Sequence, residues 1–246
     1  MSVPPAHGPS FQTTRWTQVI RLREGAGEAE RDSILQQLCQ AYWLPLYEYA
    51  RRSGKSPHDA EDMTQGFFQH ALGQDLFAKA RQDSGKMRSF LLTAFQNYIS
   101  NQYQRDTAAK RGGKTPALSL DVMQAEARYQ SEPRHTATPE ELYNRRWARD
   151  FFIAVQESLR TEYRSKGKEP FFHALQPWLF VEAKAADILL QAEALGVTEG
   201  NLRIMLLRFR KRYRELFHQG VADTLDSASK EEIDQEVREL IRLAAA

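Results

Sequence analysis

The sequence contains one short segment whose basic side chains are well placed to bind an anionic partner. Residues 202–214 are predicted to form a helix and carry six basic residues and no acidic one: Arg203, Arg208, Arg210, Lys211, Arg212 and Arg214. Gly196-Val197-Thr198 precedes this helix and supplies a helix stop, followed by a side-chain oxygen that can cap the next helix. Many proteins use a helix, a tight turn and a second helix with a basic face to present side chains to the DNA major groove.

The spacing of apolar residues divides this helix into a buried side and an outward side. One apolar stripe is predicted by residues that recur at steps of four and three: Leu202, Leu206, Phe209, Tyr213 and Leu216. The residues left facing mostly outward are Asn201, Arg203, Leu207, Arg208, Lys211 and Arg214. We expect this outward face to contact DNA. The alternative is that it is only the solvated side of an ordinary core helix.

A second cluster consists of three carboxylates, Asp59, Glu61 and Asp62, in the first turns of another predicted helix. Its apolar side is formed by Met63, Phe67, Phe68 and Leu72. Acidic residues near a helix N-terminus are stabilised by the helix dipole, so stabilisation of the helix is one explanation for them. Three carboxylates exceed what a cap requires, and the other explanation is an acidic docking face for a basic partner.

A third cluster combines aromatic, amide and basic side chains between residues 87 and 114. An apolar helix with Phe90, Phe95 and Tyr98 leads into polar and basic residues, namely Asn97, Asn101, Arg105, Lys110, Arg111 and Lys114. Aromatic and amide side chains beside a basic cluster can stack on unpaired bases and hydrogen-bond to them, while the cations hold phosphates. We expect the aromatic residues to lie in the core and the arginine and lysine residues to bind nucleic acid.

Catalysis and metal binding receive little support from the sequence. It has no glycine-rich phosphate loop and no paired-histidine metal spacing, and its six histidines are scattered. His58 and His70 are twelve residues apart, and Cys39 is the only cysteine, which excludes an intramolecular disulfide. We therefore expect no enzymatic activity, no metal and no cofactor.

The 246 residues carry a formal net charge of only +2, but the charge is segregated into patches. The basic helix is followed by an acidic tail, so partners are expected to bind locally. No apolar run approaches membrane-spanning length, and residues 1–10 lack the pattern of a signal peptide. We expect a soluble cytoplasmic protein that does not bind membranes.

Helical periodicity dominates the chain and predicts an all-α fold with two helical domains joined by a linker. Helix starts are clear at Ser56-Pro57 and at Thr138-Pro139. We predict a first helical domain at residues 11–106, followed by a linker at 107–138 that contains Gly112-Gly113 and few large apolar residues. A second helical domain is predicted at residues 139–220, and an acidic C-terminal helical extension at 221–246.

The extension is predicted to contain a helix that starts at Ser229, with Glu232 completing a capping box. Its apolar stripe consists of Ile233, Val237, Leu240 and Ile241. Two roles stay open at this point. The acidic residues of the tail can cover the basic segment 208–214, or the stripe can pack on the second domain and extend its core.

Seven motifs follow one another in order along the chain: FQTTRW at 11–16, YWLPLY at 42–47, DAED at 59–62, RSFLL at 88–92, AKRGG at 109–113, TPEELY at 138–143 and the final helix-turn-helix. Together they resemble a bacterial RNA polymerase sigma factor of the extracytoplasmic function group, in a subgroup abundant in planctomycete-type bacteria. The resemblance covers most of the chain.

The resemblance implies that the first domain is sigma region 2, which docks on a coiled coil of the polymerase β′ subunit and opens the promoter −10 element. It implies docking through Asp59, Glu61 and Asp62. It also implies −10 contacts from Arg88, Asn97, Asn101, Arg105, Lys110 and Arg111, with a pocket for a flipped base formed by Asn97 and the loop at residues 82–87. Met87 stands where an aromatic residue is common.

The second domain is similar to sigma region 4, which binds the polymerase β flap and reads the −35 element. The implied −35 contacts come from Thr198, Asn201, Arg203, Leu207, Arg208 and Lys211. Leu207 stands where a polar residue is usual, and an apolar contact with a thymine methyl is expected there.

The function expected from the sequence is promoter recognition for core RNA polymerase. One alternative is a helix-turn-helix regulator that binds duplex DNA without polymerase, and another is a helical interaction protein whose basic face meets an acidic partner. The acidic 59–62 segment argues against the first alternative, and the amide and basic residues between 97 and 111 argue against the second. Whether an anti-sigma factor, a kinase or the tail restrains the protein stays open.

Overall fold

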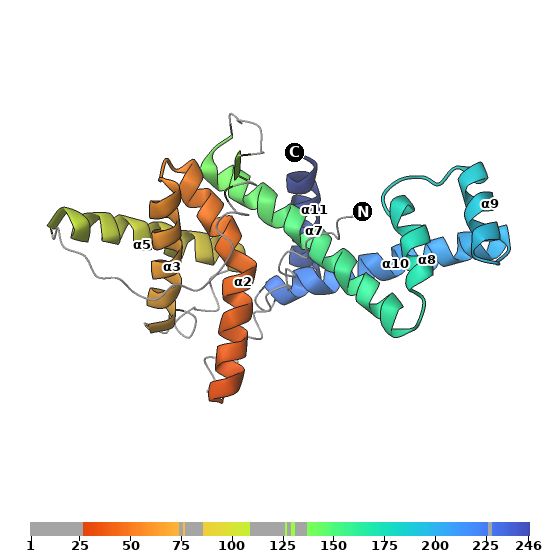
Figure 1. The fold of residues 1–246 in the computed structure, drawn as a ribbon, viewed down its shortest axis with the longest axis horizontal. Coiled ribbons are helices and arrows are strands. Elements are labelled where there is room, and N and C mark those ends of the chain that lie inside the picture. Colours follow the sequence, from red (N-terminus) through yellow and green to blue (C-terminus); the bar gives the residue numbers. More distant parts are fainter. Residues whose placement is uncertain are drawn as a thin grey trace, which may run out of the picture.

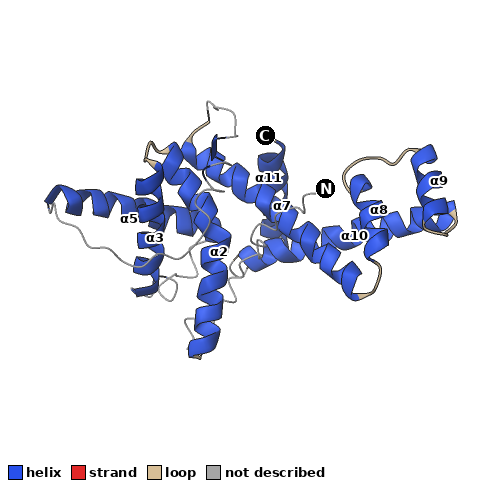
Figure 2. Cartoon of the chain, in the orientation of Figure 1, coloured by secondary structure: helices blue, strands red, loops and turns tan. Residues whose placement is uncertain are grey.

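The computed structural model describes residues 27–73, 76, 86–108, 126, 129–130, 137–225 and 228–246. Every named element in these ranges is a helix (Figure 2), which confirms the predicted all-α class. The elements in chain order are α2 (Glu28–Arg52), α3 (Pro57–Gly73), α5 (Met87–Ala108), α7 (Pro139–Ser165), α8 (Glu169–Leu175), the 3-10 helix η2 (Gln176–Trp178), α9 (Ala185–Ala194), α10 (Glu199–Thr224) and α11 (Lys230–Ala245).

Helix starts predicted from the sequence are confirmed by hydrogen bonds at their caps. Thr138 and Glu141 form a reciprocal capping box at the start of α7, and Ser229 and Glu232 form one at the start of α11. The Ser56 hydroxyl accepts a hydrogen bond from a backbone N–H in the first turn of α3 at 3.1 Å. These contacts satisfy backbone donors that have no partner within the helix.

The molecule is elongated, with α3 and α5 at one end and α9 with the start of α10 at the other (Figure 1). At the first end, α2, α3 and α5 enclose an aromatic core. The rings of Phe67 and Phe95 meet edge to face at a centroid separation of 5.2 Å. Further large residues are buried with them: Tyr42, Trp43, Tyr47 and Phe68.

Helix α7 joins the two ends, because it packs against α2 on one side and against α10 and α11 on the other. Trp147 of α7 is 1% exposed and stacks on Phe151 at 5.2 Å. The buried hydrophobic residues on both sides of α7 form one cluster. The halves predicted as separate domains therefore share a core in this structure. Most of the predicted linker, 107–138, lies outside the described residues.

Helix α11 packs on α7 and α10, as expected for one of the two roles left open for the tail, extension of the core of the second half. Leu240 is fully buried, and Ile233 and Val237 are partly buried against the core. The prediction was wrong for Ile241, which is 52% exposed; Leu243 is buried instead. The buried face of α11 is therefore turned slightly about the helix axis relative to the predicted stripe.

Candidate nucleic-acid interface

The turn between α9 and α10 has the conformation that its sequence predicts. Gly196 has a φ of 63°, in the left-handed region that glycine adopts without steric cost. The backbone N–H of Val197 donates to the carbonyl of Ala192, which closes the end of α9. The Thr198 hydroxyl then accepts from the backbone N–H of Asn201 at 3.3 Å and caps α10.

Helix α10 buries one side and exposes the other, as the periodicity predicts. Leu202, Leu206, Phe209 and Tyr213 are buried. The exposed residues include all the predicted −35 contacts: Thr198, Asn201, Arg203, Leu207, Arg208 and Lys211. Leu207 is 65% exposed, the largest exposed fraction among the large hydrophobic side chains of the described residues.

Not every arginine of α10 is available to a ligand. Arg210 donates to the backbone carbonyls of Trp178 and Val181, at 2.8 and 2.7 Å, and so fixes the loop before α9. Arg212 is held between the carboxylates of Glu162 and Glu215. The hydrogen bonds with these two carboxylates raise the pKa of Arg212, Glu162 contributing most.

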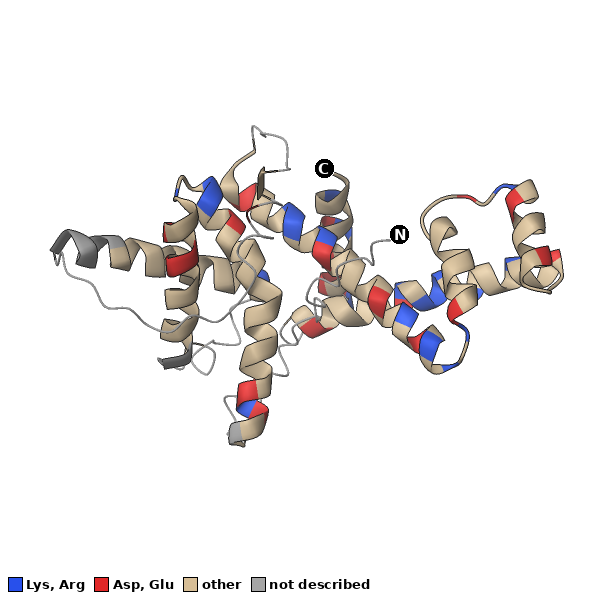
Figure 3. Cartoon of the chain, in the orientation of Figure 1, with Lys and Arg blue, Asp and Glu red and all other residues tan. Residues whose placement is uncertain are grey.

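Three cations of α10 remain on its outward face without such anchoring. Arg208, Lys211 and Arg214 are exposed and make no ion pair with any other described residue. Arg203 is also exposed, but its guanidinium donates to Glu199 one turn earlier, at 2.6 Å. Figure 3 shows the basic residues of α10 as blue bands along the helix. The face is suited to contact phosphates and base edges in a groove of duplex DNA.

A pocket of about 300 Å³ lies between α3 and α5 at the other end of the molecule. Aromatic and amide side chains line it together: Phe67, His70, Phe90, Asn97, Tyr98, Asn101 and Gln102, with Leu76, Thr93 and Ala94. The rings of His70 and Tyr98 lie 5.5 Å apart. Such a pocket can take a planar base, because rings stack on its face and amides hydrogen-bond to its edge.

The aromatic residues of α5 were predicted to be core, and the structure divides them. Phe95 is fully buried, as predicted. Phe90 and Tyr98 are only partly buried and line the pocket beside Asn97. Met87, the last residue of the predicted base-binding loop, is fully buried and takes no part in the pocket. Residues 82–85 lie outside the described part of the chain.

The other predicted −10 residues have different outcomes. Asn101 lines the pocket, as does Asn97. Arg105 lies on α5, but its side chain is outside the described part of the chain. Lys110 and Arg111 lie outside it entirely.

Arg88 was predicted to contact DNA, but it is only 2% exposed in this structure and is not accessible to a ligand. Its guanidinium donates to Glu236 of α11 and, at 3.1 Å, to Asn144 of α7. It also lies over the Trp147 ring, 5.1 Å from the centroid. Burial of a guanidinium requires such partners, because an unpaired buried charge is strongly destabilising.

The tail does not cover the basic segment 208–214 in this structure. Two of its carboxylates, Glu236 and Glu239, instead pair with Lys86 and Arg88 at the start of α5. Partial burial raises the pKa of Glu239, but the hydrogen bond from Lys86 and the neighbouring positive charges outweigh it and hold the pKa below its usual value.

Sequence reasoning missed the burial of Glu236, although a signal for it exists. Glu236 lies four residues before Leu240 and seven before Leu243, on the face that α11 buries. A carboxylate at an apolar position of a helical repeat predicts a buried ionic contact.

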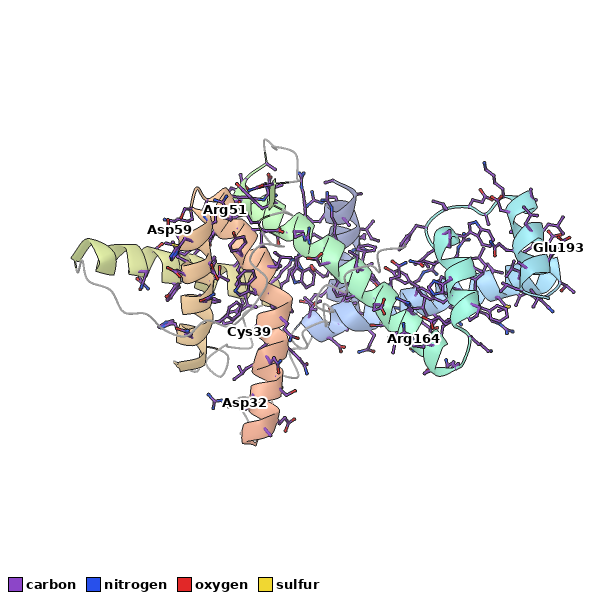
Figure 4. The ribbon with its side chains drawn as sticks, viewed as in Figure 1. Asp32, Cys39, Arg51, Asp59, Arg164 and Glu193 are labelled. Atoms are coloured by element: carbon purple, nitrogen blue, oxygen red, sulfur yellow. The ribbon has the colours of Figure 1, made fainter. Side chains whose placement is uncertain are left out.

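The three acidic residues at the start of α3, coloured red in Figure 3, are partly or fully accessible, and Figure 4 places Asp59 beside the end of α2. Asp59 accepts from the Ser56 hydroxyl at 2.7 Å, so it takes part in the cap. Gln65 donates to Glu61, and His58 lies 3.0 Å from Asp62. A hydrogen bond with its own backbone and the Asp62 carboxylate raise the pKa of His58.

A further ionic contact joins the predicted linker to α2. Arg51 donates to both oxygens of Glu126, and the Tyr47 hydroxyl donates to one of them at 2.8 Å. The Arg51 hydrogen bonds lower the pKa of Glu126 to about 2. The two partners are 75 residues apart in sequence, and no local pattern predicts the contact.

Gly66 allows α3 to approach α5 at the pocket, because a Cβ there would overlap the Tyr98 hydroxyl. We expect Gly66→Ala to lower the free energy of unfolding by about 1–3 kcal/mol, since the overlap outweighs the gain in helix propensity. Adding Tyr98→Phe removes the obstructing oxygen and is expected to restore most of the loss. Denaturant unfolding measures both changes. Gly200→Ala is the control, because a Cβ there meets nothing within 4 Å. Equal stability of wild type and Gly66→Ala would contradict this account of the close approach.

Comparison with known proteins gives no identification: no family model, curated protein or solved structure matches the chain. Among the described residues, no helix is both long and apolar enough to cross a membrane. The same residues hold no group of three or more histidine, cysteine or acidic side chains arranged to bind a metal ion.

Proposed function

We propose that this protein is a sigma factor, which directs core RNA polymerase to promoters and recognises two promoter elements with two different surfaces. One observation carries the proposal. The exposed face of α10 is suited to duplex DNA, and the pocket between α3 and α5 is suited to an unpaired base. The two surfaces lie at opposite ends of one chain (Figure 1), as recognition of two separated elements requires.

In this proposal α10 reads the −35 element and the pocket receives a flipped base of the −10 element. The exposed chemistry of α10 supports base reading of two kinds. Asn201 and Arg208 offer hydrogen bonds to base edges, while Leu207 offers apolar contact to a thymine methyl. Such a protein works where polymerase works, in the cytoplasm, and catalyses no reaction itself.

The acidic start of α3 is the proposed docking site for a basic surface of the polymerase β′ subunit. Glu61 and Asp62 are better placed for it than Asp59, whose carboxylate is engaged with the Ser56 cap. Their contacts are with Gln65 and His58 on the same helix, so a partner can replace those contacts without unfolding α3.

Reversing the charge at Glu61 or Asp62 to lysine is expected to weaken retention on immobilised core RNA polymerase at least tenfold, because attraction becomes like-charge repulsion. Asp32→Lys is the matched control: Asp32 is an exposed acid near the start of α2, at the far end of that helix from Asp59 (Figure 4). A pull-down with purified core polymerase measures the loss, and circular dichroism checks that the helices persist.

The outcomes separate the proposed function from its alternatives. Retention that is lost in Glu61→Lys and kept in Asp32→Lys supports docking through α3. Full retention of every variant removes the docking assignment. If the wild-type chain binds duplex DNA but is not retained by polymerase at all, the protein is a DNA-binding regulator that acts without polymerase.

A further inference from the structure

Helix α11 carries a carboxylate on the side that it buries. Glu236 is 1% exposed and lies among the buried residues Leu240 and Leu243 of the same helix. A buried carboxylate is costly unless cations and hydrogen bonds compensate for its lost hydration. The partners of Glu236 therefore act together with the apolar contacts of Leu240 and Leu243 in keeping α11 docked.

Those partners come from the opposite half of the chain. Arg88 donates to one oxygen of Glu236, and the Lys86 ammonium lies 2.6 Å from the other. Glu239, one turn further along α11, pairs with the same two cations. The pairing partners are far apart in sequence, since 148 residues separate Arg88 from Glu236. These four side chains, the α5–α11 ion cluster, fasten the start of α5 to the tail.

Carboxylates and phosphates are recognised by the same cationic groups, because both offer paired oxygens to a guanidinium. On the basis of the proposed function, we propose that α11 is an autoinhibitory clasp. In the free chain Glu236 and Glu239 occupy positions on Lys86 and Arg88 that DNA phosphates take once α11 is released. The clasp thus keeps part of the DNA-binding surface covered until a promoter or polymerase displaces it.

The geometry defines what the clasp controls. Arg88 lies nine residues before Asn97 on α5, which places it about half a turn around the helix from the pocket residue and about 13 Å along the axis. The pocket itself is not covered by α11, since its lining residues come from α3, α5 and position 76. Release of α11 therefore adds phosphate binding and leaves base selection unchanged.

The docking of α11 is suited to release. Few of its apolar side chains are fully buried, and its buried face contains the charge of Glu236. If Glu236 loses its charge, Arg88 keeps only the weaker contact with Glu239 and is less well compensated for its burial, and departure of α11 restores its access to water. Opening of the clasp is thus the direct response to neutralising Glu236.

The test compares Glu236→Gln with Glu231→Gln in the full chain. Each substitution removes one negative charge from α11, but Glu231 is exposed in the first turn and outside the ion cluster. The probe is a labelled DNA duplex with a central unpaired bubble. Its affinity is measured over a range of salt concentrations, and amide hydrogen exchange of residues 230–245 reports release of α11 independently.

We expect Glu236→Gln to accelerate exchange in α11 and to bind the probe about tenfold more tightly. Its affinity should also fall more steeply as salt concentration rises. A plot of the logarithm of the binding constant against the logarithm of the salt concentration should become steeper by about 0.7–0.9 for each additional phosphate that the protein neutralises. Glu231→Gln should match the wild type in both measurements. Adding Arg88→Gln to Glu236→Gln should abolish the increase in affinity, while preference among bubble sequences stays the same throughout.

Several results would overturn the clasp. Faster exchange in α11 with unchanged affinity shows that the ion cluster is structural only, and the proposed function then still stands. Unchanged exchange shows that Glu236 does not hold α11. If the probe binds no variant although α11 is released, the clasp and the DNA-binding role of the N-terminal half both fail. If Glu236→Gln unfolds the protein, Glu239→Gln replaces it in the test, because the Glu239 side chain is 34% exposed. This variant must then show smaller increases in α11 exchange and in probe affinity, and the clasp is rejected if it does not.

Discussion

Replacing Trp147 with alanine is expected to lower the free energy of unfolding by about 3–5 kcal/mol. Trp147 is 1% exposed in α7, stacks on Phe151, and has the Arg88 guanidinium over its ring. Truncation removes the buried packing of this ring and also part of the environment that keeps Arg88 buried. Equilibrium unfolding in denaturant, followed by circular dichroism, measures the loss.

Ile153→Ala provides a matched control on the same helix. Ile153 is 62% exposed, so its truncation should change stability by no more than about 0.5 kcal/mol. The shared core further predicts one cooperative transition, shifted as a whole by Trp147→Ala. Two separate transitions, only one of them sensitive to Trp147→Ala, would show that the halves fold independently and that α7 does not couple them.

Replacing Arg208 with alanine is expected to cost about 1–3 kcal/mol of DNA binding if its guanidinium contacts a base edge. Arg208 is exposed on α10 and makes no ion pair with another described residue, so it is free to meet a ligand. Loss of a base contact relaxes selectivity at one position. Loss of a phosphate contact instead weakens all sequences alike and lowers the log–log salt slope by about 0.9.

Binding is measured on a duplex that the wild-type chain selects from a random pool, and on single-position variants of it. Arg212→Ala is the control, because it removes the same charge from the same helix while Glu162 and Glu215 already hold that guanidinium. Arg203→Ala should cost less than Arg208→Ala, since Arg203 must first leave Glu199. If Arg208→Ala keeps full affinity and selectivity, the outward face of α10 does not read DNA.

The sequence predicted the features that depend on residues close together in the chain. The caps at Ser56, Thr138, Thr198 and Ser229 were correct, because a cap is a hydrogen bond between residues three positions apart. The buried stripe of α10 and the left-handed turn at Gly196 were correct for the same reason. Helical period and backbone freedom are properties of a few consecutive residues.

Only the tertiary structure decided which charged residues are available to a partner. Arg88 was expected to contact DNA, and Arg210 and Arg212 belong to the basic segment 202–214, yet each has an internal partner in the fold. The pocket between α3 and α5 likewise requires the close approach of two helices that Gly66 permits.

The physical reason is the range of the interactions. Capping and helical periodicity act within a few residues of one another, and the sequence states them directly. A buried ion pair depends on the full set of groups that exclude water from it, and here these groups come from α5, α7 and α11. The sequence thus determined the helices and the outward face of α10, whereas packing around α7 decided that Arg88 is covered by the tail.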